Sequence, residues 1–144
     1  MLLKLNEHIV KDIINDDPVR PHIKAKWRSA HGREVFGLYE DGNIKKLRSV
    51  ICVAYTDAIP AEEKDMDTVG SNTAVFYTVW SYDRGAGRDI VFAAANHIKS
   101  NHKDVIQYVT LSPLTTMAEQ FHTKNGAKLI AKHKTCQNFE YTVQ

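Results

Sequence analysis

The chain has 144 residues, of which 43% are hydrophobic and 25% are charged, and its formal net charge is +2. This length is typical of one domain with a single hydrophobic core, and the residue balance excludes a disordered or fibrous chain. A net charge so close to zero also argues against a nucleic-acid-binding protein. We therefore expect one globular domain over residues 1–144.

The two cysteines and the N-terminal charges indicate the compartment. Cys52 and Cys136 form no CxxC motif and no cluster with histidines, so we expect two buried, reduced thiols. Lys4, Glu7 and Lys11 interrupt any signal-peptide core, and no later segment has the length of a membrane span. These features predict a cytoplasmic protein without a membrane partner.

The first half of the chain predicts one helix followed by three strands. Apolar residues recur at helical intervals over residues 6–15, and this helix should end before Pro18. Residues 34–40, 48–56 and 73–81 are rich in β-branched and aromatic residues, which predicts strands. Asp41-Gly42-Asn43 is a hairpin turn between the first two strands. The acidic segment 58–72 is expected to be a loop outside the core.

The second half alternates helices and strands. Helical spacing predicts a helix over residues 88–101, and residues 105–111 return to strand character. A second helix is expected over residues 114–125, ending at Gly126, and residues 127–143 read as a terminal pair of strands. This order predicts an α+β domain with a central, mostly antiparallel mixed sheet flanked by helices.

A glycine-containing loop, "RGAGR" at residues 84–88, connects the third strand to the helix that follows. Glycines let a backbone approach a phosphate closely, and the first N–H groups and the dipole of a helix attract anions. The loop lacks the GK[ST] ending of a P-loop and does not open a βαβ unit as a dinucleotide fingerprint does. A plain tight turn is the alternative reading of the same residues.

In this strand order, the loop resembles the pyrophosphate-binding loop of the GNAT superfamily of N-acetyltransferases, whose members bind coenzyme A. Gly85 and Gly87 match the superfamily pattern, Tyr82 occupies its leading basic position, and Arg84 stands where a lysine is common. The resemblance implies a GNAT-like fold that binds an acyl-CoA. It also implies that coenzyme A contacts Thr78, Val79, Arg84, Gly85, Ala86, Gly87, Arg88 and Lys124.

Five blocks resemble the malonyl-CoA decarboxylase family more specifically, whose catalytic domain has the same fold. "TLSPL" (residues 110–114) and "FHTKNGA" (residues 121–127) are similar to the family signatures "TLSP" and "FHLxNGA". "TAVFYTV" is similar to "TAIFYSI", "ICVAYTDAIP" to "VEVALTDGIP", and the closing "NFEY" to "VNYRY". The blocks follow the family's order from about residue 50 to residue 141.

The resemblance implies a catalytic pair formed by Ser112 and His122. His122 also falls on the position where GNAT enzymes often carry a tyrosine that acts as a general acid. The implied roles are general acid/base and carboxylate partner for His122, and proton relay for the hydroxyl of Ser112. Thr110 lies on the same strand face as Ser112 and is the alternative hydroxyl. The coenzyme A thioester is the substrate, and no metal or permanently bound cofactor is implied.

Other readings of the same residues stay open. His122 could be a structural histidine that bonds a backbone carbonyl, and Ser112 could only cap a turn. The remaining histidines, His8, His22, His31, His97, His102 and His133, show no ligand spacing and are expected at the surface.

Two other functions, and a homodimer, also remain open. An N-acetyltransferase would need a general base, for which Tyr77 and Tyr82 are poor candidates, and the sequence does not place Glu62 or Glu63. A non-catalytic binding module is a further alternative, since one fold carries many functions.

Overall fold

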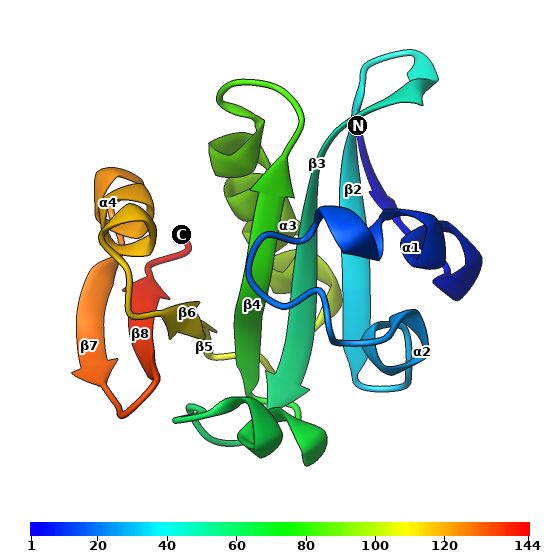
Figure 1. Cartoon of the computed structure of the whole chain (residues 1–144). Coiled ribbons are helices and arrows are strands. Elements are labelled where there is room, and N and C mark those ends of the chain that lie inside the picture. The colour runs from blue at the N-terminus through cyan, green and yellow to red at the C-terminus, as the bar shows by residue number, and fades with distance from the viewer.

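A single mixed sheet runs through the computed structural model, which describes residues 1–144 (Figure 1). Its strand order is β1-β2-β3-β4-β5-β8-β6, with β7 paired to β8. Every pair of neighbouring strands is antiparallel except β4 and β5. The strands are β1 (Leu2–Lys4), β2 (Arg33–Glu40), β3 (Asn43–Thr56), β4 (Thr73–Ser81), β5 (Gln107–Thr110), β6 (Ser112–Pro113), β7 (Lys128–Lys132) and β8 (Cys136–Tyr141). The expected α+β class and mostly antiparallel sheet are confirmed.

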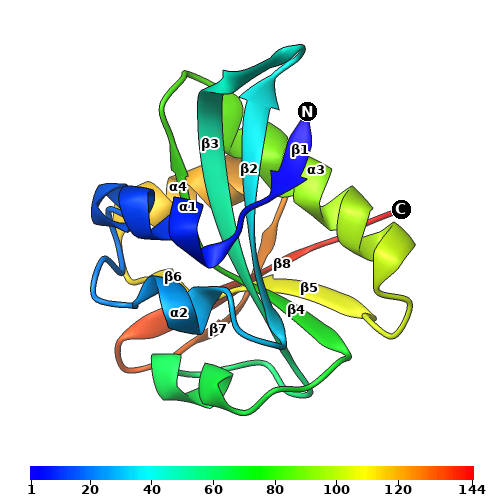
Figure 2. The same cartoon turned by 90° about the vertical axis from the view of Figure 1, so that its right-hand side faces the viewer.

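Helices cover both faces of the sheet. α1 (Glu7–Ile13) and α2 (Ala25–Arg28) lie on one face, while α3 (Ala86–Asn101) lies on the other (Figure 2). α4 (Thr116–Lys124) packs beside α3 through Phe121, and two short 3₁₀ helices, η1 (Ile14–Asp16) and η2 (Glu63–Asp67), complete the elements. Side chains alternate along β4, so that Val75 and Tyr77 join the α1/α2 core and Phe76 joins the α3 core.

The structure adds elements that the sequence pattern did not predict. β1 has three residues and α2 has four, which is too short for a hydrophobic period to be visible. The expectation that segment 58–72 lies outside the core was wrong at Met66. This residue is 1% exposed because η2 folds it under the α1/α2 face of the sheet.

β4 and β5 separate part-way along their length. They pair only from Thr73 opposite Gln107 to Phe76 opposite Thr110, and the Leu111 amide then donates to the Phe76 carbonyl at 3.1 Å. Beyond this point, residues 77–81 of β4 have no strand beside them on the β5 side, and Figure 1 shows β4 diverging from β6 and β8. We call this divergence the β4–β5 wedge. A register shift in the β3–β4 pairing leaves Tyr77 without a partner, between the pairs Cys52–Thr78 and Val53–Phe76, and marks where the wedge opens.

A buried ion pair holds the N-terminal segment against the sheet. Arg28 donates to the Asp17 carboxylate at 2.8 Å, and both side chains are 0% exposed. Asp17 also accepts bonds from the amides of Val19 and Arg20 and from the Thr78 hydroxyl on β4. Burial alone would raise the pKa of Asp17, but these hydrogen bonds outweigh it and lower the pKa. The ionised Asp17 carboxylate therefore links the N-terminal segment to the part of β4 that borders the wedge.

Candidate active site

His122 lies on the buried side of α4, facing β8. Thr115 caps the start of the helix, since its hydroxyl accepts the Ala118 amide, and Gly126 follows the C-cap residue with a positive φ of 92°. The imidazole is 8% exposed, stacks on the Phe139 ring at 5.3 Å, and has Nδ1 2.7 Å from the Tyr141 hydroxyl. Nε2 has no hydrogen-bond partner in the protein and is not fully enclosed. This nitrogen is therefore available to a ligand.

Burial sets the protonation of this histidine. It lowers the pKa of His122 to about 4, so that the ring is neutral at pH 7. Burial also raises the pKa of Tyr141 to about 12, against smaller opposing effects of Asn125 and Arg88. A protonated phenol beside a neutral imidazole donates to Nδ1, which leaves the ring proton on Nε2. His122 thus presents a hydrogen-bond donor, Nε2–H, toward its open side.

The lowered pKa of His122 predicts an acid-dependent loss of stability. The unfolded histidine binds a proton near pH 6.5 and the folded one only near pH 4, so the free energy of unfolding falls as pH drops through this window. We expect about 2 kcal/mol to be lost between pH 7 and pH 5 relative to a His122→Gln variant. Urea unfolding of both proteins at the two pH values measures this difference. Parallel pH curves for the two proteins would contradict it.

Thr110 and Ser112 form a hydroxyl pair at the end of β5. Their oxygens are 2.7 Å apart, which confirms that the two side chains share a face, and both are buried. Thr110 Oγ1 also accepts the Phe139 amide at 3.1 Å, while Ser112 pairs with Gln137 across β6 and β8. No hydrogen bond joins His122 to Ser112. Phe139 links His122 to the hydroxyl pair, since its ring stacks on His122 and its amide donates to Thr110 Oγ1.

The glycine loop caps α3 with free amides. Gly85 is the N-cap residue with a positive φ of 82°, a conformation that other residues rarely adopt. The amides of Gly87 and Arg88 have no acceptor in the protein. A Cβ at Gly87 would lie 3.4 Å from the Phe121 ring, so α4 packs closely against this helix start. The loop thereby has the free donors that a phosphate requires.

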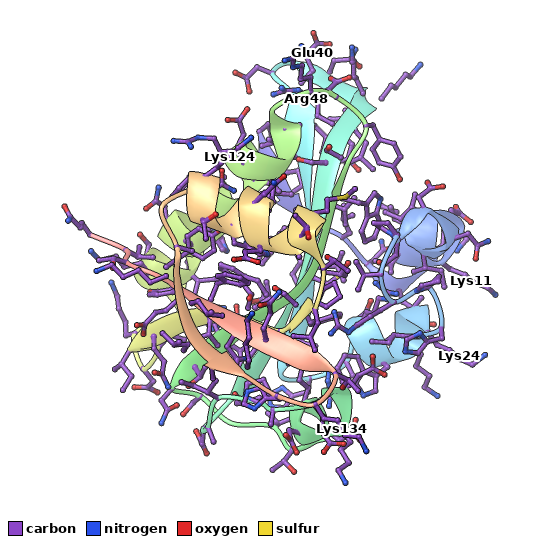
Figure 3. The ribbon with its side chains drawn as sticks, turned by 60° about the vertical axis from the view of Figure 1, so that its left-hand side comes forward. Lys11, Lys24, Glu40, Arg48, Lys124 and Lys134 are labelled. Atoms are coloured by element: carbon purple, nitrogen blue, oxygen red, sulfur yellow. The ribbon has the colours of Figure 1, made fainter.

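Basic side chains surround the loop. Arg84, Arg88 and Lys124 are exposed, and Figure 3 shows Lys124 and Arg48 at the same end of the molecule. Arg48 pairs with Asp83 at 3.4 Å and with Asp89 at 3.8 Å, so part of its charge is already compensated. Tyr82, at the leading position of the loop, donates instead to Asp16 at 2.6 Å.

At Thr78 and Val79 only the backbone groups are free to contact a ligand, because both side chains make other contacts. The Thr78 hydroxyl is bonded to Asp17 at 2.8 Å, and the Val79 side chain packs against the α3 core. Both residues lie on the part of β4 that borders the wedge, where the strand pairs with β3 but has no strand on its β5 side. A ligand lying in the wedge could therefore pair with this strand edge.

The structure adds three residues to the candidate site that the sequence analysis did not assign to it. Tyr141 contacts His122, and its only signal was its position in the "NFEY" block. Arg20 is buried beside the wedge, where it donates to the Tyr77 carbonyl, and no sequence signal marked it. Glu63 binds His22 at 2.9 Å and Arg20 at 3.2 Å, which gives a position to a residue that the sequence left unplaced.

Two of the histidines expected at the surface are only partly exposed. His102 is half-buried, stacks on Tyr55 and bonds Glu34 at 2.7 Å, while half-buried His133 bonds the Asn138 amide oxygen at 2.6 Å. Both rings can be partly buried because a polar side chain forms a hydrogen bond with a ring nitrogen there. The cysteine prediction holds, since Cys52 and Cys136 are both buried free thiols.

Two surface cavities lie away from the predicted residues. One, of about 520 Å³, is lined by residues such as Glu34, Tyr55 and His102, and the other, of about 640 Å³, by Trp27 and Glu63 among others. No cluster of three or more His, Cys, Asp or Glu side chains is arranged to hold a metal ion.

None of the helices combines the length and apolar character needed to cross a membrane.

Comparison with known proteins identifies the fold. No protein-family model and no curated protein sequence matches the chain. The structure of malonyl-CoA decarboxylase from Rhodopseudomonas palustris is similar at a TM-score of 0.75 and 16% identity, covering 99% of this chain and 60% of that one. The decarboxylase from Agrobacterium vitis matches at 0.68 and 22% identity, covering 88% and 37%. A Bacillus subtilis acetyltransferase in complex with CoA matches at 0.68 and 11% identity, covering 99% and 98%.

The chain has the GNAT fold. This confirms the fold that the glycine loop and the strand order implied. The chain spans 60% and 37% of the two decarboxylase structures, whereas it spans nearly the whole of the acetyltransferase. At these identities the similarity shows the fold alone, and the GNAT fold supports more than one chemistry.

Proposed function

We propose that this protein is an acyl-CoA enzyme that converts malonyl-CoA to acetyl-CoA and CO2. The observation that carries the proposal is the buried, neutral His122 with an open Nε2, which Phe139 links to the Thr110–Ser112 hydroxyl pair. Such a site offers neutral hydrogen-bond donors inside a poorly solvated environment, where they stabilise a developing negative charge strongly. The ordered sequence blocks that resemble the decarboxylase family support the same reaction.

The proposed binding mode uses the wedge. The pantetheine chain would pair with the free edge of β4 at Thr78 and Val79, and the pyrophosphate would bind the free amides of Gly87 and Arg88. The positive charges of Arg84, Arg88 and Lys124 surround this phosphate position. The thioester would then lie near the point where β4 and β5 separate, next to Thr110.

The proposed chemistry follows from the donors. When the bond between the α-carbon and the carboxylate breaks, CO2 leaves and the electron pair moves onto the thioester oxygen as an enolate. His122 Nε2–H donates to that oxygen, with Tyr141 holding the ring orientation through Nδ1. The α-carbon then takes one proton from the Ser112–Thr110 hydroxyl pair, which water restores. The net reaction consumes one proton per malonyl-CoA.

Incubation with malonyl-CoA and detection of acetyl-CoA by mass spectrometry tests the proposal. We expect acetyl-CoA to accumulate with the wild-type protein and to fall to background with His122→Ala. Equal amounts from both proteins would contradict the proposed function. Binding of the thioester without any conversion would instead support a non-catalytic module.

One observation favours an N-acetyltransferase as the second candidate. Glu63 and His22 form a hydrogen-bonded pair on the α1/α2 side of the sheet, with both Glu63 oxygens within 3.0 Å of His22 Nε2. A carboxylate–histidine pair can take a proton from an amine that attacks a thioester. Acetylation of amines by acetyl-CoA, abolished by Glu63→Gln, would favour this candidate over the decarboxylase.

The phosphate-binding loop makes a prediction about affinity. An Arg84→Ala/Arg88→Ala variant should bind coenzyme A about tenfold or more weakly, because charge-assisted contacts to phosphate are lost. Its affinity for a pantetheine thioester that lacks the nucleotide should not change. Calorimetric titration with both ligands measures this. Lys11→Ala is the matched control, since Figure 3 shows Lys11 far from Lys124, and equal weakening by this control would contradict the assigned loop.

A further inference from the structure

Arg20 is a buried cation at the opening of the wedge. Its residue is 5% exposed, and Nη1 donates to the backbone carbonyl of Tyr77 on β4. Nη2 lies 3.8 Å from the thiol of Cys136, the first residue of β8. The guanidinium therefore contacts both β4 and β8, the strands that diverge at the wedge. Tyr77 is the first residue of β4 beyond its pairing with β5, so this group lies where the wedge begins.

The positive charge of Arg20 is only partly compensated. Its direct ion pair is to Glu63, 3.2 Å from Nε, and that carboxylate is 41% exposed and shared with His22. The nearby Asp17 carboxylate bonds Arg28, Thr78 and two backbone amides, and it makes no bond to the Arg20 guanidinium. A thiol is a weak acceptor, which leaves Nη2 without a strong partner. A buried guanidinium with a free donor favours a second carboxylate.

The Arg20 guanidinium and His122 lie on opposite faces of the sheet. Tyr77 and Cys136 belong to the α1/α2 core, whereas Phe139 and Tyr141, which contact His122, belong to the α3 core. An acyl group that lies in the wedge with its thioester beside His122 would direct its far end through the opening toward Arg20.

We propose that Arg20 binds the free carboxylate of the acyl group and so selects carboxylated thioesters, such as malonyl-CoA, over acetyl-CoA. The proposal rests on the binding mode of the proposed function. Glu63 then acts as a competitor, because it occupies Nε of the same guanidinium in the free protein. Arg20 is in this account a specificity residue that touches the substrate, while His122 and the hydroxyl pair carry the chemistry.

Calorimetric titration with malonyl-CoA and acetyl-CoA in a His122→Gln background, in which decarboxylation is expected to be about 100- to 1,000-fold slower, tests this. We expect the background protein to bind malonyl-CoA at least tenfold more tightly than acetyl-CoA. Adding Arg20→Gln should remove this preference and leave the affinity for acetyl-CoA unchanged. The matched control is Arg33→Gln, because Arg33 bonds backbone carbonyls of η2 and lies over Trp27, away from the wedge.

A second variant keeps the proposal testable if Arg20→Gln fails to fold. Glu63→Gln retains Arg20 and removes its competitor, so it should raise the affinity for malonyl-CoA several-fold without changing that for acetyl-CoA. Equal effects of either variant on both thioesters, or no preference in the background protein, would overturn the proposal.

The failure of this proposal can be told apart from failure of the proposed function. An Arg20-dependent preference for malonyl-CoA without acetyl-CoA production by the wild-type protein would support the carboxylate site and exclude the decarboxylase. Acetyl-CoA production with a preference that does not depend on Arg20 would overturn the carboxylate site and leave the decarboxylase standing.

Discussion

Replacement of His122 by glutamine is expected to lower kcat for malonyl-CoA decarboxylation by about 100- to 1,000-fold, the usual cost of losing one oxyanion donor. Glutamine can still bond Tyr141, so the protein should fold, but its amide does not reproduce the imidazole Nε2–H. The donor acts mainly on the enolate, so KM should change much less than kcat. Steady-state production of acetyl-CoA measures both constants.

His8→Gln is the control for this substitution. His8 is exposed on α1 and makes no side-chain contact with the site, so its replacement should leave both constants unchanged. A loss of less than about threefold in His122→Gln would remove His122 from the chemistry. Equal losses in the two variants would point to a general effect of the substitution.

Asp17→Asn is expected to lower the free energy of unfolding by about 3–5 kcal/mol, because it leaves the Arg28 guanidinium buried without its counter-ion. Arg28 is 0% exposed and its remaining bonds go to the carbonyls of Ile23 and Arg20 and to the Cys52 thiol. Burial raises the pKa of that thiol to about 11, so Cys52 cannot replace the lost charge at pH 7. Urea unfolding at pH 7 measures the loss.

A double variant separates the lost charge from lost packing. Asp17→Asn/Arg28→Met removes both charges, and it should recover a large part of the stability that Asp17→Asn alone loses. Asp12→Asn, an exposed position on α1, should stay within about 0.5 kcal/mol of the wild type. If Asp17→Asn matched Asp12→Asn, the buried ion pair would not stabilise the fold as described.

The periodic elements were predictable because their patterns are local. β2, β4, α3 and the β7–β8 pair each contain enough residues for a period to be visible, and the hairpin turn has Gly42 at a positive φ of 76°. α2 has four residues, and its position depends on Arg28 reaching Asp17 rather than on any apolar repeat. Short elements that are fixed by one buried polar contact leave no such signal.

Part of the candidate site was also predictable from a local sequence pattern. Thr110 and Ser112 are two residues apart on a strand, so their shared face follows from the pleat. The bond between His122 and Tyr141 joins residues 19 apart, and the contact of Arg20 with Cys136 joins residues 116 apart. Such contacts depend on how the strands diverge around the wedge, which no local pattern encodes.

The crystal structure of the protein with bound malonyl-CoA, in the His122→Gln variant that is expected to convert it about 100- to 1,000-fold more slowly, is the most direct test. We expect the pantetheine to lie along Thr78 and Val79 of β4, the pyrophosphate at Gly87, and the thioester beside residue 122 and the Thr110–Ser112 pair. Coenzyme A bound outside the β4–β5 wedge, for example in the cavity near His102, would contradict it.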